Sequence, residues 1–77
     1  MNMEKLLKIL LDLHPEIDFT NHTHLIDNGV LDSFDIVTLV GELNDAFDIQ
    51  IGIEDLLPEN FNSPAAMLKL IERLQAG

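Results

Sequence analysis

The sequence contains no cysteine and only four basic residues, against fourteen acidic ones. Without cysteine, neither disulfides nor thiolate metal ligands can hold the chain together, so its stability must come from packing. The net charge of -10 argues against nucleic acid as a partner, because nucleic-acid phosphates would repel this surface. The charge favours partners with basic surfaces, although it also fits a small domain that is acidic only to stay soluble.

Long apolar runs are missing as well. No stretch approaches the roughly 20 apolar residues that a transmembrane helix needs, so we expect no stable insertion into a membrane. Residues Met1–Lys5 include an acid and lack a small-residue cleavage site, and the apolar run that follows is interrupted by Lys8 and Asp12. We therefore predict no signal peptide and a cytoplasmic location, which the lack of cysteine suits.

The 77 residues are predicted to form one domain, residues 1–77, folded as a small all-α four-helix bundle. Leucine and isoleucine recur at helical spacing over residues 2–13, and His14-Pro15 ends that first helix. Residues 15–32 form a long loop between the first and second helices. Apolar side chains are expected to pin this loop to the bundle, namely Ile17, Phe19, Leu25, Ile26, Val30 and Leu31.

The rest of the chain is predicted to supply two long helices and a short one between them. Helical periodicity covers residues 34–47. An extended connector follows, which we expect to bury Ile49 and Ile51, with Ile53 as a further candidate. Residues 54–57 are predicted to form the short third helix and residues 58–61 a turn with Phe61 packed inward. Ser63-Pro64 is typical of a helix start and begins the last helix.

The stretch Gly29–Asp35 joins the long loop to the second helix. Its glycine allows a tight backbone approach, and the two apolar residues after it can anchor the segment. Either Asp32 or Ser33 can cap the helix, since both residue types are favoured at an N-cap. On spacing alone, an ordinary cap and a functional site are both open interpretations.

A helical wheel divides residues 34–47 into three faces, of which the broad apolar one is predicted to be core. The opposite, solvated face is expected to consist of Asp35, Thr38, Glu42 and Asp45. Beside the core runs an apolar stripe of Phe34, Val37 and Gly41 that begins next to Ser33. We interpret the stripe as a docking strip for partner enzymes with a charged border. The alternative is that Phe34 and Val37 tuck under the long loop. The candidate partner-binding residues are Phe34, Asp35, Val37, Thr38, Gly41, Glu42 and Asp45.

Other kinds of site find little support. His22 and His24 place two imidazoles close together, but no third ligand is evident, so no metal site is predicted. No Gly-x-Ser-x-Gly elbow surrounds Ser33, and no base is apparent that could activate it as a nucleophile. We therefore predict no catalytic residue in this chain.

Asp32-Ser33, preceded by Leu31 and followed by a bulky apolar residue, resembles the phosphopantetheine attachment motif of acyl and peptidyl carrier proteins. That motif usually reads Asp-Ser-Leu, with a glycine a few residues upstream. The similarity continues over residues 37–49, where the family has its second helix and the turn after it. It extends through residues 53–56, 58–61 and 63–64, and so covers nearly the whole chain.

The resemblance implies that Ser33 accepts 4′-phosphopantetheine through a phosphodiester. It also implies that Asp32, the motif neighbour, contacts the phosphopantetheinyl transferase or its metal ion. The thiol of the arm would carry an acyl or aminoacyl group as a thioester, loaded by an activating ligase and passed to a downstream acyltransferase or synthase. The implied protein is a non-catalytic carrier, most simply a monomer.

Some positions depart from the family pattern. Phe34 replaces the usual Leu, and Gly41 stands where fatty-acid carriers often have Met. Thr38 and Asn44 stand where those carriers usually place acids. The departures weigh against a fatty-acid synthase partner, and the later segments look more like stand-alone aminoacyl, D-alanyl or polyketide carriers. Two alternatives come from other classes: an unmodified small acidic protein-interaction module that docks through the apolar stripe, and an inhibitor that mimics nucleic acid.

Overall fold

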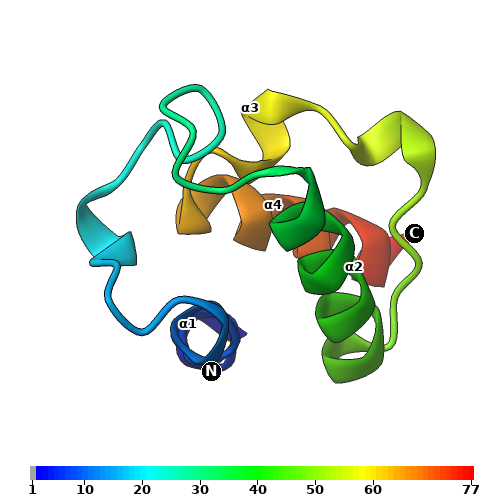
Figure 1. The fold of residues 1–77 in the computed structure, drawn as a ribbon. Helices are drawn as coiled ribbons and strands as arrows, with labels where there is room; N and C mark the ends of the chain where they lie inside the picture. The colour runs from blue at the N-terminus through cyan, green and yellow to red at the C-terminus, as the bar shows by residue number, and fades with distance from the viewer. Residues whose placement is uncertain (1) are drawn as a thin grey trace.

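The computed structural model describes residues 2–77, which form four α-helices and two single 3₁₀ turns (Figure 1). No strand occurs within these residues, so the prediction of a small all-helical bundle is confirmed. The α-helices are α1 (Asn2–Leu13), α2 (Ser33–Phe47), the single-turn α3 (Pro58–Phe61) and α4 (Pro64–Ala76); the 3₁₀ turns are η1 (Phe19–Asn21) and η2 (Ile53–Asp55).

The core lies where the three long helices meet. α1 packs against both α2 and α4, while α4 also contacts α2 and α3. Figure 1 shows α4 passing behind α2. Each helix contributes residues at i, i+3 or i+4 spacing, as an amphipathic helix should. The buried residues of the three helices are Leu6 and Leu10 of α1, Leu39, Leu43 and Phe47 of α2, and Pro64, Met67, Leu70 and Ile71 of α4.

The predicted bounds of the first helix and the predicted start of the last helix are confirmed. α1 ends at Leu13, one residue before the His14-Pro15 pair, because the residue before proline is disfavoured in helical conformation. α4 begins at Pro64 with Ser63 as its N-cap, and the Ser63 hydroxyl accepts a hydrogen bond from the Ala66 N–H at 3.1 Å. Within residues 2–77 no helix is both long and apolar enough to cross a lipid bilayer.

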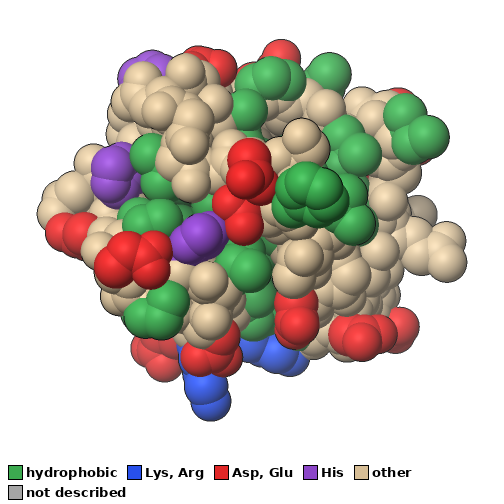
Figure 2. Space-filling view, in the orientation of Figure 1, with side chains coloured by type: hydrophobic (Ala, Val, Ile, Leu, Met, Phe, Trp, Pro, Cys, Tyr) green, Lys and Arg blue, Asp and Glu red, His purple; other side chains and the backbone are tan. Residues whose placement is uncertain are grey.

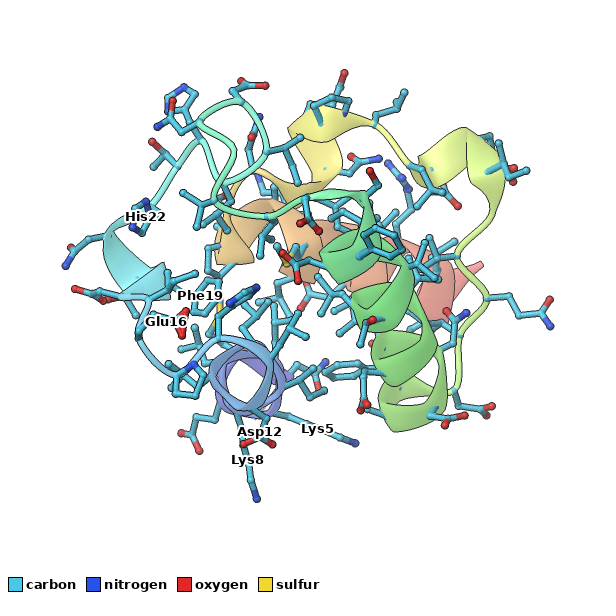
Figure 3. All side chains as sticks on the ribbon, in the orientation of Figure 1. Lys5, Lys8, Asp12, Glu16, Phe19 and His22 are labelled. Atoms are coloured by element: carbon cyan, nitrogen blue, oxygen red, sulfur yellow. The ribbon has the colours of Figure 1, made fainter. Side chains whose placement is uncertain are left out.

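The long connection between α1 and α2 is held down by its apolar residues, as predicted. Phe19, Leu25 and Leu31 are buried, with at most 2% of each side chain exposed. Figure 3 shows the Phe19 side chain beside α1, whereas Lys8 and Asp12 project outward from that helix. The connection therefore has a defined path that ends at the start of α2.

Asn62, between α3 and α4, fastens this connection with its side chain. Its Oδ1 accepts hydrogen bonds from the backbone N–H groups of Ile26 at 2.9 Å and Asp27 at 3.1 Å. Its Nδ2 donates to the Asp27 carboxylate at 3.2 Å, and its backbone carbonyl accepts from the Leu25 N–H at 2.9 Å. Three consecutive residues of the loop thus donate their backbone N–H groups to one residue that lies 35–37 positions later.

The segment between α2 and α4 differs from the prediction in three respects. Residues 54–57 do not form the third helix; only the η2 turn is present there, and the short helix occupies residues 58–61, predicted as a turn. Pro58 explains the shift, because it forces Leu57 into an extended conformation and suits the first position of a helix. The connector buries Ile49 and half-buries Ile51, but Ile53 is 87% exposed. Phe61 is packed inward as expected.

Candidate functional site

A reciprocal pair of hydrogen bonds closes the start of α2. The Asp32 carboxylate accepts from the Asp35 N–H at 2.9 Å, and the Asp35 carboxylate accepts from the Asp32 N–H at 3.1 Å. This capping box satisfies donors that a helix start would otherwise leave free. Of the two predicted caps, the structure selects Asp32, and Ser33 becomes the first helical residue.

The approach to Ser33 is shaped by Gly29 and Leu31. Gly29 has a backbone φ of 73°, a conformation that costs other residues energy, and its N–H bonds to the Ile26 carbonyl at 3.0 Å. Leu31 is buried, and its N–H bonds to the Leu25 carbonyl at 3.1 Å. The chain is thus anchored two residues before Ser33, whose own side chain is exposed to solvent.

The titratable groups around Ser33 are occupied with structural contacts. Asp35 lies 3.0 Å from the His14 Nε2 atom in addition to its place in the capping box. Burial alone would raise the pKa of Asp35, but the Asp32 N–H and the His14 ring outweigh it and hold this pKa below its ordinary value. Asp35 is therefore an ionised, engaged carboxylate, which is a poor general base for the serine hydroxyl.

The apolar stripe of α2 lies open on the surface. Phe34 is 85% exposed and Val37 is 71% exposed, so the alternative in which they tuck under the long loop is wrong. Gly41, one turn further on, is exposed as well. Figure 2 shows apolar side chains gathered over the start of α2 and over the segment that precedes α3. That segment contributes Ile53, Leu56 and Leu57, which sequence reasoning did not assign to this surface.

Three of the four residues predicted for the solvated face are exposed, namely Thr38, Glu42 and Asp45. Asp35 is the exception, because its side chain retains only 18% of its accessible surface. The wheel placed it correctly opposite the core of its own helix, but α1 ends beside it and His14 covers it. Helical periodicity describes one helix in isolation and cannot report such a neighbour.

A small apolar cavity of about 80 Å³ lies beside the exposed stripe. It opens between α2, the long connection and α3, and its walls are Ile26, Ile36, Leu56, Leu57, Pro58 and Phe61. In the described part of the chain, no three His, Asp or Glu side chains are grouped so that they could hold a metal ion.

Comparison with known proteins gives two findings. The family described as "phosphopantetheine attachment site" matches residues 4–71, which is most of the chain. Curated relatives include the D-alanyl carrier proteins of Bacillus cereus (strain B4264) and Bacillus anthracis (strain CDC 684 / NRRL 3495). Each is 31% identical over 51 residues, covering 66% of this chain and 65% of the relative, just under two thirds of the relative's length.

Proposed function

Because this chain belongs to the family of phosphopantetheine-binding carrier proteins, we propose that Ser33 carries the phosphopantetheine arm covalently. One observation supports this choice above others: Asp32 performs the capping, which leaves the exposed Ser33 hydroxyl without that duty at the first turn of α2. A serine used as the cap would have its oxygen committed to a backbone N–H.

The surroundings of Ser33 fit a phosphodiester. A phosphodiester is anionic, and the N-terminus of the 15-residue helix α2 provides backbone amides and a favourable dipole. The capping box engages the Asp35 N–H, so the amides of Ser33 and Phe34 are the ones available to such an anion. The arm, when attached, supplies a terminal thiol that holds an acyl or aminoacyl group as a thioester.

This chain contributes position and recognition to that chemistry. In the transfer step, an O–P bond forms at Ser33 Oγ while the pyrophosphate bond of coenzyme A breaks and 3′,5′-ADP leaves. Because Asp35 is engaged elsewhere, we assign removal of the serine proton to the transferase. Asp32 remains our candidate for contact with that enzyme or its metal ion, since it is exposed beside Ser33.

We further propose that α2 is the partner-binding face. Phe34, Val37 and Gly41 form its apolar strip, and Thr38, Glu42 and Asp45 form a polar and acidic border. Asp35 remains a candidate partner-binding residue beside the strip. Because His14 covers most of its side chain, we expect it to support the strip rather than to contact a partner directly. The partners are a phosphopantetheinyl transferase, an activating ligase and a downstream acyltransferase or synthase, each meeting a chain of net charge -10.

For the cargo, we propose an aminoacyl group, with D-alanine the first to test. The relatives named as D-alanyl carrier proteins support this proposal. The carrier would be one domain over residues 1–77, acting as a non-catalytic monomer in the cytoplasm.

The first experiment is intact-protein mass spectrometry after incubation with coenzyme A and a promiscuous phosphopantetheinyl transferase. The wild type is expected to gain one phosphopantetheine and Ser33→Ala none. Ser63→Ala is the matched control, because Ser63 is the only other serine and caps α4. An unmodified wild type, where a reference carrier is modified and the cognate transferase also fails, would favour the unmodified interaction module. Modification of Ser33→Ala would place the arm elsewhere.

The modified protein then allows the cargo to be tested. With ATP, D-alanine and a ligase that activates D-alanine, the mass is expected to rise by one alanyl group that hydroxylamine removes, as it does thioesters. The same reaction on Ser33→Ala should give no gain. Loading by a fatty-acyl ligase in place of the amino-acid ligase would refute the aminoacyl assignment.

The docking strip can be tested without disturbing the fold. Phe34→Ala and Val37→Ala should raise the transferase KM severalfold at unchanged melting temperature, because both side chains are exposed. Leu11→Ala, which truncates a 43% exposed leucine on α1, is the control and should leave KM unchanged. Equal effects at all three positions would argue against a specific strip.

A further inference from the structure

His14 occupies the point where the end of α1 meets the start of α2. It follows the last residue of α1 and precedes Pro15, and its backbone N–H bonds to the Leu10 carbonyl at 2.9 Å. Its ring lies between two carboxylates: Nδ1 is 3.1 Å from Glu16 Oε2, and Nε2 is 3.0 Å from Asp35 Oδ1. The side chain is only 27% exposed, so it is largely enclosed.

Both ring nitrogens therefore face negatively charged oxygens. A neutral imidazole carries one N–H, so one of its nitrogens would turn a lone pair toward a carboxylate, whereas the imidazolium offers an N–H on each side. Nε2 is shielded from solvent, and the group it faces is the Asp35 carboxylate, whose Oδ1 lies 3.0 Å away. The C-terminal end of α1 favours a positive charge at this position as well.

The charges that face the ring come from α2 and from the connection. Asp35 supplies one and Glu16 the other, while Lys8 and Asp12 project from α1 on the outer side, and Glu16 lies beside the end of that helix (Figure 3). The contact with Asp35 raises the pKa of His14 above its ordinary value of 6.5, burial opposes this, and Glu16 adds to the rise. Asp35, for its part, has a lowered pKa.

We propose that His14, as an imidazolium, is a positioning residue that clasps the end of α1 to the first turn of α2 and so holds the segment presenting Ser33. One carboxylate makes the link: Asp35 Oδ1 faces the ring while Oδ2 accepts the Asp32 N–H. The contact with His14 therefore restrains the backbone on both sides of Ser33, at Asp32 through the hydrogen bond and at Asp35 itself. The clasp itself is independent of the proposed function; only its effect on modification of Ser33 rests on that function.

The clasp depends on pH with a definite sign. The folded-state pKa of His14 is raised, so its contribution is complete below the unfolded value and is lost as the pH rises through the folded value. The folded-state pKa of Asp35 is lowered, so its contribution is present above the unfolded value and is lost as the pH falls through the folded one. The stabilisation by the clasp is therefore complete between the unfolded-state pKa values of Asp35 and His14, and it is lost as the pH rises through the folded-state pKa of His14 or falls through that of Asp35.

Asp35→Asn is the sharpest test, because asparagine keeps an oxygen that can accept the Asp32 N–H but removes the charge that faces His14. An NMR titration of the imidazole C–H signals, assigned with His14→Gln, is expected to give a His14 midpoint above 6.5 in the wild type and a lower one in Asp35→Asn. Equal midpoints in the two proteins would overturn the clasp. This result needs no cofactor, so it stands apart from failure of the proposed function.

Amide hydrogen exchange reads the positioning role directly. At neutral pH, His14→Gln should accelerate exchange in the first turn of α2 severalfold relative to the wild type, and the difference should shrink above the titration midpoint of His14. His24→Gln, which changes an exposed histidine, is the matched control and should leave exchange there unchanged. The same pH dependence is expected in the rate at which the transferase modifies Ser33. Exchange that is the same in His14→Gln and the wild type at every pH would overturn the proposal.

Discussion

Asn62→Ala tests whether the long connection is held by one polar side chain. The substitution removes three hydrogen bonds, two from backbone N–H groups of residues 26 and 27 and one to the Asp27 carboxylate. The Ile26 amide is half-buried, so leaving it unsatisfied should cost about 1–2 kcal/mol, and the two exposed bonds about 0.5 kcal/mol each. Alanine suits the helical backbone of Asn62, whose φ and ψ are -70° and -22°, so no strain is added.

The expected loss of about 2–3 kcal/mol is large for this chain, because a domain of its size is stable by about 4–12 kcal/mol. With an unfolding entropy of about 2.1 cal/mol/K per residue, the melting temperature should fall by about 12–18 °C. Circular dichroism at 222 nm measures this, and hydrogen exchange should show faster opening at Ile26 and Asp27.

Asn60→Ala is the matched control. Its side chain makes one hydrogen bond, from Nδ2 to the Asp55 carbonyl at 2.9 Å, so its loss should cost only about 1 kcal/mol. Asn62→Asp should fall between the two alanine variants, because it keeps the acceptor but places a carboxylate against Asp27. If Asn62→Ala were no less stable than Asn60→Ala, the inference that Asn62 fastens the connection would be refuted.

Thermal unfolding tests three further predictions. Gly41→Ala should stabilise by about 1 kcal/mol and Gly29→Ala should destabilise by about 1–2 kcal/mol. A Cβ would meet nothing within 4 Å at either glycine, so we expect the opposite effects on stability to come from the positive φ of Gly29. If both substitutions raised the melting temperature, or both lowered it, this reasoning would be refuted. Asp48→Asn should stabilise by about 0.5–1 kcal/mol, because Asp48 is an acid at the C-terminal end of α2 with a φ of 54°; an unchanged or lower melting temperature would contradict it. Leu39→Ala should cost about 3–5 kcal/mol, because Leu39 is fully buried; a loss below 1 kcal/mol would show that the site can collapse.

Features with local causes were predictable from the sequence. The end of α1 follows from the proline at position 15, and the start of α4 from Ser63 and Pro64, because each signal acts within a few residues. Residues 49–53 have an isoleucine at every second position, and this alternation, on which the expected burial of the connector depends, was misleading in part. It predicted the burial of Ile49, but the η2 turn begins at Ile53 and leaves that side chain 87% exposed.

Contacts between distant polar residues could not be predicted. Asn62 bonds to residues 35 and 36 positions earlier, and His14 faces an aspartate 21 positions later. An asparagine or histidine in a sequence has no periodic partner, so nothing local distinguishes a structural polar residue from an exposed one. His14 stands before a proline and ends a helix, which accounted for it without any contact to α2. In hindsight, an acid at the third position of a capping box and a histidine ending the preceding helix are complementary charges, but only the packing of α1 on α2 brings them together.

At the start of α2, helix capping and the proposed attachment of the arm fall to two different residues, which the sequence alone did not distinguish. Asp32 and Ser33 were equally good caps by residue type, and a cap at Ser33 would have engaged its hydroxyl with a backbone N–H. Two features favour Asp32: Asp35 three residues later completes the capping box, and its ionised state is supported by His14. A serine at the first helical position then keeps an exposed hydroxyl close to the helix amides.

We therefore expect Asp32→Ala to do more than weaken the helix. Without the aspartate, Ser33 becomes the best remaining cap, and the transferase rate should fall even at temperatures where the variant is fully folded. Asp32→Asn retains a capping oxygen and should leave the Ser33 hydroxyl free. Both variants lose the carboxylate that we assign to the transferase or its metal ion, so the comparison between them isolates capping, and Asp32→Asn should keep a higher rate than Asp32→Ala. Equal rates for the two variants would show that capping does not control the availability of Ser33.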